Sequence, residues 1–172
     1  MKISAKDLTL VALFSALIAV GAFIKIPFLL VPITLQTLFI VLSALVLERK
    51  LAVLSVIVYI MIGLVGFPIF ANGGGINYIF SPTFGYLVSF IFATYFISSF
   101  KEKNIYISTA IGMLIIYFFG MIYFIFIQYV LNGKVYLINY LFYNLFLVFL
   151  PGDILSCVVA IIGYRKILRL KK

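Results

Sequence analysis

The sequence predicts an all-α integral membrane protein with six transmembrane helices and both termini in the cytoplasm. Apolar residues make up 66% of the 172 residues and charged residues 10%, which leaves too few polar groups to cover a soluble domain. The apolar residues form long continuous runs rather than the alternating segments of a transmembrane barrel. Basic residues cluster at both chain ends and in alternate connections between the apolar runs. This is the pattern of helical membrane proteins with a fixed orientation.

Six apolar runs define the expected spans, because a helix needs roughly 20 apolar residues to cross a bilayer. In order they are residues 8–24, 33–47, 51–65, 81–100, 105–131 and 151–163. We expect the first run to be kept rather than cleaved as a signal peptide, since further spans follow it. Residues 135–149 are expected to cover the outer surface or to re-enter the membrane. Residues 1–172 are therefore expected to form one membrane-embedded domain.

The distribution of the 13 basic residues predicts the orientation of these spans. Lys25 and Lys134 fall on the side opposite the termini. The others fall on the side of the termini: Lys2, Lys6, Arg49, Lys50, Lys101, Lys103, Arg165, Lys166, Arg169, Lys171 and Lys172. The more basic side of a helical membrane protein faces the cytoplasm, so both termini are expected there. The net charge of +9 then reflects topology and contact with anionic lipid headgroups, and we expect no nucleic-acid partner.

Missing residue types exclude most classes of enzyme. The chain has no histidine and one cysteine, Cys157. It therefore has no zinc site of the usual kind, no Ser–His or Cys–His catalytic pair and no disulfide within the chain. It also lacks the Gly-x-x-x-x-Gly-Lys-Ser/Thr loop that binds ATP phosphates. We expect neither an enzyme nor a cofactor, and uptake against a gradient would need energy from other subunits.

Asp153 is the acid with the most unusual sequence context. The other three acids each lie beside a basic residue, whereas Asp153 has apolar sequence on both sides. An ionised carboxylate next to hydrocarbon costs about 2.5–3.5 kcal/mol on insertion scales and needs a partner. Pro151 and Gly152 favour a helix start, whose free N–H groups and dipole would stabilise the charge locally. Alternatively, the carboxylate faces a buried cavity and receives donors from a ligand.

Uncharged polar residues gather with Asp153 on the outer side of this topology: Thr34, Gln36, Asn72, Asn77, Ser81, Thr83, Tyr86 and Asn144. The stretch Asn72-Gly73-Gly74-Gly75 is too rich in glycine for a helix, and irregular backbone near membrane depth is tolerated where it lines a cavity or is buried. Polar groups and one carboxylate at the mouth of an apolar bundle predict a pocket for a small molecule. The alternative is that these residues cap helix ends.

Ala12 and Ala16 lie four residues apart and share one face of the first span. Small residues at this spacing let a second helix approach closely. Spacing alone leaves two alternatives open, which are packing within the chain and docking on a membrane partner.

Several motifs together resemble those of one family. They are Val31-Pro32-Ile33-Thr34-Leu35-Gln36-Thr37, Gly63-Leu64-Val65-Gly66-Phe67-Pro68-Ile69-Phe70 with the glycines after it, Pro82-Thr83-Phe84-Gly85-Tyr86-Leu87, and Phe149-Leu150-Pro151-Gly152-Asp153. In order and spacing they are similar to the BioY biotin transporters over about residues 12–160. The resemblance implies a substrate-binding S component of an energy-coupling-factor (ECF) transporter in the plasma membrane of a prokaryote. Six helices would bind biotin near the outer face, and a transmembrane T component with two ATPases would drive uptake.

The resemblance also implies roles for individual residues. The expected substrate site comprises Asp153, Asn72, Gly73, Gly74, Gln36, Tyr86 and Ser156. Asp153 would accept the ureido N–H donors of biotin, and Asn72 would bind the same ring. Ala12 and Ala16 resemble the alanine motif by which S components dock on the T component.

Two positions depart from the pattern of the family. Members commonly carry a lysine three residues after the aspartate, and some carry an arginine after the Gly-Tyr pair, whereas this chain has Ser156 and Leu87. Either Lys25, Lys134, hydroxyls and helix-end N–H groups hold the substrate carboxylate, or the substrate differs from biotin at that end. The alternatives are an S component for another small vitamin-like carboxylic acid and a membrane scaffold or channel. A pore should show polar residues through the depth of several spans, and this chain has them at one end.

Overall fold

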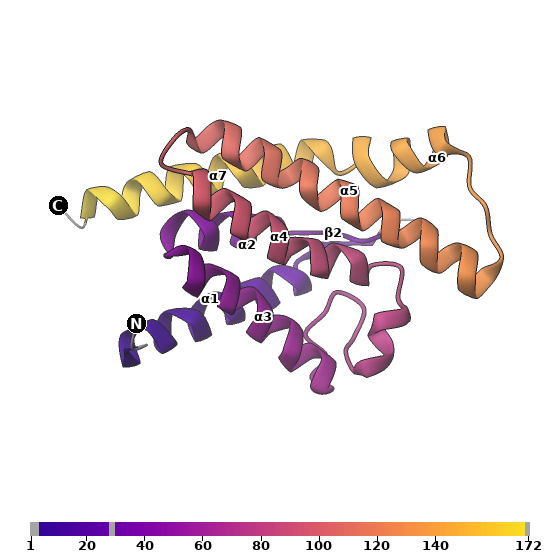
Figure 1. Ribbon diagram of the computed structural model, residues 1–172, viewed down its shortest axis with the longest axis horizontal. Coiled ribbons are helices and arrows are strands. Elements are labelled where there is room, and N and C mark those ends of the chain that lie inside the picture. Colours follow the sequence, from indigo (N-terminus) through magenta and orange to yellow (C-terminus); the bar gives the residue numbers. More distant parts are fainter. Residues whose placement is uncertain (1–3, 28–29, 171–172) are drawn as a thin grey trace.

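The computed structural model describes residues 4–27 and 30–170 as a bundle of apolar helices (Figure 1). The helices are α1 (Ala5–Phe23), α2 (Gln36–Val46), α3 (Arg49–Val65), α4 (Phe84–Phe100), α5 (Ile105–Asn132), α6 (Ile138–Phe142) and α7 (Leu150–Leu170). A 3-10 segment, η1 (Ile76–Phe80), precedes α4, and a π-helical segment, η2 (Tyr143–Leu147), joins α6 to α7. The strands β1 (Lys25–Ile26) and β2 (Ile33–Thr34) pair antiparallel between α1 and α2.

This arrangement confirms the predicted all-α membrane fold. The helix α1, the helix α5 and the stretch Ile138–Leu170 are each long and apolar enough to cross a bilayer, and α2 and α4 are shorter apolar helices. The helix α4 packs along α5, α1 packs on α3, and α2 packs on α7. Buried side chains such as Ile40, Tyr59, Ile97 and Phe124 form the core. Both termini lie toward one end of the bundle, as an even number of crossings requires (Figure 1).

The sixth span is longer than the sequence predicts. Residues 135–149 are expected to cover the outer surface or to re-enter the membrane, and of these, residues 138–149 continue the span through α6 and η2. Pro151 has no N–H and cannot bond to the carbonyl four residues earlier. The π-helical turn before it absorbs this irregularity, with the Val148 N–H donating to the Tyr143 carbonyl at 3.1 Å. The helical path therefore reaches Asp153 from α6 instead of beginning at the Pro-Gly pair.

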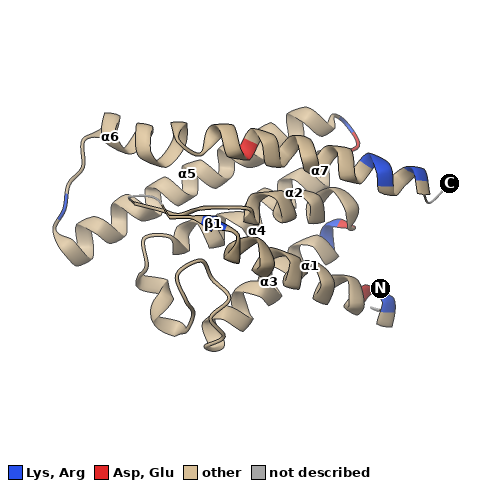
Figure 2. Cartoon of the chain, turned by 180° about the vertical axis from the view of Figure 1, so that it is seen from behind, with Lys and Arg blue, Asp and Glu red and all other residues tan. Residues whose placement is uncertain are grey.

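Basic side chains gather at one end of the bundle (Figure 2). They lie near both chain ends, at the turns between helices on that side and along the last turns of α7. Lys134 instead follows the last residue of α5, whose first residue lies just after Lys103 at the basic end. Lys2, Lys171 and Lys172 fall outside the described residues. The segregation agrees with the predicted orientation, and the assignment of this end to the cytoplasm stays a prediction.

Lys101 joins two turns at the basic end. Its ammonium donates to the carbonyls of Ala44, Leu45 and Leu47 at 3.1, 2.8 and 2.7 Å, where α2 ends. A cation there satisfies carbonyls that have no partner inside the helix and interacts favourably with the helix dipole. Desolvation lowers the pKa of Lys101, because partial burial disfavours the charged form.

The helix α1 packs through one face and leaves the other uncovered. Ser15 and Ile18 are buried, and the Ser15 hydroxyl donates to the Ser55 carbonyl of α3 at 2.7 Å. Ala12 and Ala16 lie on the other face and are exposed. Within the described chain the two alanines are therefore not part of the α1–α3 contact, and docking on a partner stays a prediction.

Candidate functional site

A small cavity of about 50 Å³ lies between α2, α4, α5 and α7, beside β2 and the loop before η1. Its apolar wall includes Val31, Leu87, Phe90, Ile116 and Phe149. Its polar wall includes Thr34, Gln36, Thr37, Tyr78, Thr83, Tyr86, Tyr117 and Asp153. The fold thus brings together three predicted site residues that are far apart in the sequence, Gln36, Tyr86 and Asp153.

Asp153 is held at this cavity by α7 and has a partner on α5. Its side chain is 9% exposed, and the Tyr117 hydroxyl donates to its Oδ2. The backbone N–H of Asp153 donates to the Phe149 carbonyl at 3.0 Å, as in a continuous helix. Within the described chain the carboxylate is therefore partnered across the bundle and not by its own helix start. A carboxylate whose protein donors are neutral hydroxyls keeps acceptor capacity, which favours the cavity interpretation of Asp153.

Tyr86 presents an unsatisfied hydroxyl next to the same cavity. Its ring lies against Gly120 of α5, where an added Cβ would come closer than 3.0 Å to the ring. Glycine at this position therefore lets the ring pack directly on the α5 backbone. Across residues 4–27 and 30–170, the buried Tyr86 hydroxyl has no hydrogen-bond partner. A buried hydroxyl without a partner destabilises the protein by about 1–3 kcal/mol. A ligand that accepts a hydrogen bond from it would gain a similar amount of binding free energy.

Gln36 is fixed by a short hydrogen-bond network. Its Nε2 donates to the Tyr59 hydroxyl at 2.8 Å, and its Oε1 accepts from the Thr34 hydroxyl at 3.2 Å. Tyr59 is fully buried on α3 and donates in turn to the Ile69 carbonyl at 3.3 Å. The network joins the start of α2 to the loop that leads into the glycine-rich stretch.

The glycine-rich stretch forms a tight turn beside the cavity. The Phe70 N–H donates to the Gly73 carbonyl at 2.8 Å, and the Gly73 N–H donates back to the Phe70 carbonyl at 3.2 Å. Gly73 has a φ of 119°, which residues with a side chain rarely adopt. The turn leaves Asn72 exposed, and Ala71 is the neighbour that lines the cavity. Asn72, Gly73 and Gly74 are thus beside the cavity rather than in its lining.

The residues considered for the substrate carboxylate divide between the cavity and its surroundings. Leu87 lines the cavity, whereas Ser156 is buried one turn further along α7, outside the lining. Lys25 lies on β1, and its ammonium donates to the Ala71 carbonyl. Lys134 is exposed in the segment that follows α5. Both lysines are outside the lining of this cavity.

Part of the polar cluster makes local hydrogen bonds just before the helices. The Thr34 hydroxyl accepts from the Gln36 N–H at 3.4 Å, and the Ser81 hydroxyl accepts from the Thr83 N–H at 3.4 Å. The Thr83 hydroxyl donates to the Tyr78 hydroxyl at 2.9 Å, at the cavity wall. Neither α2 nor α4 has a side-chain cap hydrogen bond in the described chain, so helix capping does not account for these hydroxyls.

Tyr117 is a site residue that the sequence alone does not single out, as are Thr37 and Tyr78 in the cavity lining. It is one of 12 tyrosines in the chain and lies inside the longest helix, α5, with apolar neighbours. Its position along the helix could have identified it, because it lies far from the helix ends. Tyr117 follows the first residue of α5 by 12 positions, or roughly 18 Å along the axis. Tyrosine is favoured at the membrane interfaces, so a tyrosine this deep indicates an internal hydrogen-bond partner.

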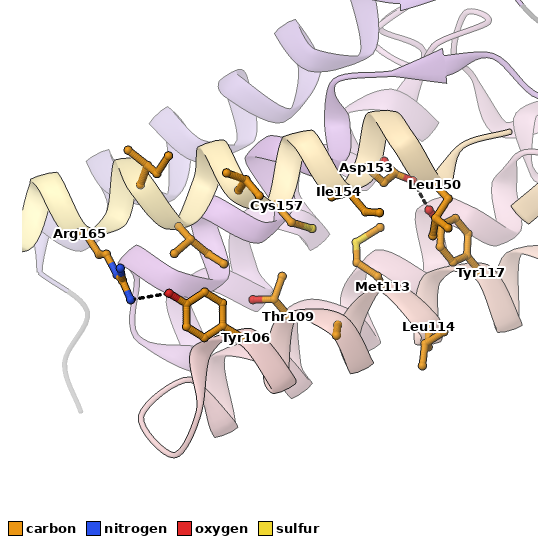
Figure 3. A pocket seen from close by; sticks show the side chains of 14 residues that line it. Tyr106, Thr109, Met113, Leu114, Tyr117, Leu150, Asp153, Ile154, Cys157 and Arg165 are labelled. Carbon is orange, nitrogen blue, oxygen red and sulfur yellow. Dashed lines mark hydrogen bonds between the residues drawn. The ribbon is translucent and has the colours of Figure 1, made fainter. Parts of the chain in front are cut away.

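A groove of about 450 Å³ lies between α5 and α7, on the other side of the Tyr117–Asp153 pair (Figure 3). Tyr117 and Asp153 line both the groove and the cavity. Figure 3 shows this pair toward one end of the groove and the Tyr106–Arg165 pair at the other. The hydrogen bond between Tyr117 and Asp153 therefore lies where the two spaces meet.

These features define the class of protein, which is an α-helical integral membrane protein with a buried carboxylate at a polar cavity between its helices. Comparison with known proteins makes the assignment specific. The sequence model of the BioY family matches residues 1–172. The chain therefore belongs to the BioY family, and it is a membrane transport protein rather than an enzyme.

Individual relatives agree with this assignment. A biotin transporter BioY of Thermotoga maritima is 38% identical over 173 residues, covering 97% of this chain and 96% of the relative. A probable biotin transporter BioY of Lysinibacillus sphaericus is 46% identical over 121 residues, covering 66% of this chain and 62% of the relative. A crystal structure of the S component for biotin from an ECF-type ABC transporter is 28% identical, with a TM-score of 0.71 over 95% of this chain and 91% of that chain. The predicted membrane fold thus has a solved counterpart.

Proposed function

We propose that this chain is the S component of an ECF transporter and that it binds biotin with high affinity. The names of its relatives and of the similar solved structure support this substrate. The observation within the chain that carries the proposal is the buried Asp153 carboxylate at the cavity, close to the unpaired hydroxyl of Tyr86. Another small vitamin-like carboxylic acid is the alternative substrate, because Leu87 and Ser156 replace the basic residues of other family members.

The ureido ring of biotin matches these two groups. It offers N–H donors, which Asp153 would accept, and a carbonyl, to which the Tyr86 hydroxyl would donate. Hydrogen bonds to an ionised acceptor are shorter and stronger than bonds between neutral groups. A bound ureido ring would therefore stabilise the buried charge of Asp153 and remove the cost of the unpaired hydroxyl at the same time.

The cavity has to enlarge to admit biotin. Its volume of about 50 Å³ has room for about one or two water molecules. Small-molecule pockets usually measure about 300–1,000 Å³. Ureido donors would compete with the Tyr117 hydroxyl for Asp153, and release of Tyr117 would open the cavity on the side of α5. Ligand binding and enlargement would thus be coupled at this pair.

The carboxylate of biotin would be bound mainly by neutral groups. In the described part of the chain, the cavity lining holds no lysine or arginine. The lining does supply the hydroxyls of Thr34, Thr37 and Thr83 near the starts of α2 and α4. The Thr34 and Thr83 hydroxyls now donate to Gln36 and Tyr78 and would have to turn to donate to a carboxylate, so we expect the acid end to contribute less affinity than the ureido ring.

Uptake would require further subunits. We propose a transmembrane T component and two ATPases as partners, in the plasma membrane of a prokaryote. The exposed Ala12 and Ala16 on α1 supply a surface that lets a partner helix approach closely. The basic end with both termini would face the cytoplasm and the ATPases.

Accumulation of labelled biotin tests the proposal. Cells that cannot make biotin should accumulate it when they express this chain with a T component and two ATPases. With ATPases that cannot hydrolyse ATP, the same cells should bind biotin without accumulating it. Accumulation against a gradient by the chain alone, in vesicles without nucleotide, would contradict the proposal.

A further inference from the structure

The groove between α5 and α7 is apolar along most of its length. Met113 and Leu114 of α5 face Ile154, Val158 and Ile162 of α7 across it. Several of these side chains are about half exposed, as expected of surface that contacts hydrocarbon. Each helix packs elsewhere, α5 on α4 and α7 on α2, so the groove is an uncovered seam of the bundle.

The ends of the groove differ in chemistry. Toward the outer end lies the Tyr117–Asp153 pair, and at the basic end Arg165 donates to the Tyr106 hydroxyl at 2.8 Å. Lys166 and Arg169 follow Arg165 on α7 and are exposed. The guanidinium of Arg165 has five N–H donors in a fork that suits phosphate. One end of the seam therefore offers an anion site next to an apolar channel.

The length of the groove fits one leaflet of a bilayer. Twelve residues separate Asp153 from Arg165 on α7, which is about 18 Å along a helix, and half the hydrocarbon core is about 15 Å. The groove has a volume of about 450 Å³ and an apolar lining that runs from Leu150 to Ile162 along α7. An elongated apolar groove of this length suits an acyl chain whose headgroup lies at the basic end.

We propose that this groove is a binding site for an anionic phospholipid of the leaflet at the basic end. The phosphate would lie against Arg165, with Tyr106 beside it, and one acyl chain would fill the groove toward Asp153. The Arg165 guanidinium, which lines the groove, favours an anionic over a zwitterionic headgroup. The groove adjoins the cavity proposed for biotin at the Tyr117–Asp153 pair, but its headgroup end at Arg165 lies outside the cavity lining, and the proposal does not depend on biotin binding.

Lipid retention by the full chain in detergent tests this site. Native mass spectrometry after titration should show one phosphatidylglycerol bound more tightly than phosphatidylcholine. Arg165→Gln should weaken phosphatidylglycerol binding about fivefold, whereas Lys166→Gln, which removes the same charge one residue outside the groove, should change it less than twofold.

A second pair of variants tests the groove without changing charge. Ala110→Phe would place a ring in the groove from an exposed position of α5, and Ile107→Phe adds a ring on the same helix outside the lining. Ala110→Phe should abolish the tight phosphatidylglycerol adduct, and Ile107→Phe should retain it. Equal retention of the two lipids by the unmutated chain, or unchanged binding in Ala110→Phe, would overturn the proposal. A dimer in place of the lipid adduct would do the same.

Discussion

Replacing Asp153 by asparagine should weaken biotin binding strongly and leave the fold intact. The side chain is 9% exposed, and its Oδ2 accepts from the Tyr117 hydroxyl. Asparagine keeps the size and one oxygen, so Tyr117 retains an acceptor. The amide nitrogen, however, would place a donor against the ureido N–H groups. Each hydrogen bond to a charged acceptor contributes about 1.5–3 kcal/mol, so the loss of two corresponds to roughly 10²- to 10⁴-fold weaker binding.

Calorimetric titration of biotin and thermal melting, measured on the same purified proteins, check this prediction. If Asp153 acted only at its helix start, affinity would stay unchanged and stability would fall by about 1 kcal/mol, or about 2–4 °C. Asp7→Asn is the matched control, because Asp7 accepts from Ser4 in the capping box of α1, outside the cavity lining. If Asp153→Asn binds biotin within about threefold of the unmutated chain, the Asp153 carboxylate does not accept the ureido N–H donors.

Three further predictions concern other parts of the structure. Ala12→Trp and Ala16→Trp should each prevent co-purification with the T component and leave biotin affinity unchanged, since both alanines are exposed on α1. An unchanged yield of complex in both would contradict the docking role. Tyr86→Phe should raise the melting temperature of the ligand-free chain by removing an unpaired hydroxyl, and should weaken biotin binding about tenfold. A lower melting temperature with unchanged affinity would show that the ligand does not use this hydroxyl. Lys101→Met should lower the free energy of unfolding by about 1–2 kcal/mol, because it removes the cation at the end of α2. Lys103→Met is the control in the same thermal melts, and equal effects of the two would count against the role of Lys101.

Hydropathy and charge placement suffice to predict the membrane fold, because the cost of burying polar backbone restricts the chain to helices. The same reasoning leaves residues 135–149 either on the outer surface or re-entering the membrane, and it does not predict that residues 138–149 continue the sixth span. Pro151 and Gly152 are typical of a helix start, and the sequence shows no sign of the π-helical turn that carries the helix through them. A π turn depends on how α6 and α7 pack in the bundle. The helix propensities of neighbouring residues carry no information about that packing.

The candidate site is predicted in part. Gln36, Tyr86 and Asp153 line one cavity, because each is polar and lies in the first turn of its helix, α2, α4 and α7. Asn72 lies outside the lining, since the Phe70–Gly73 pairing turns it outward, and sequence cannot tell which side of a glycine turn faces inward. The role of Tyr117 depends on the distance between α5 and α7, which only the three-dimensional structure supplies.

Titration of biotin into the purified, unmutated chain tests directly whether this chain binds biotin. Titration should give one site per chain with a dissociation constant below about 1 μM. The free ureido analogue without the valerate arm should compete for the same site, because Asp153 and Tyr86 are expected to contribute most of the binding affinity. The absence of biotin binding in a chain that melts cooperatively would contradict the assignment of biotin as the substrate. Leu87 and Ser156 would then indicate another substrate.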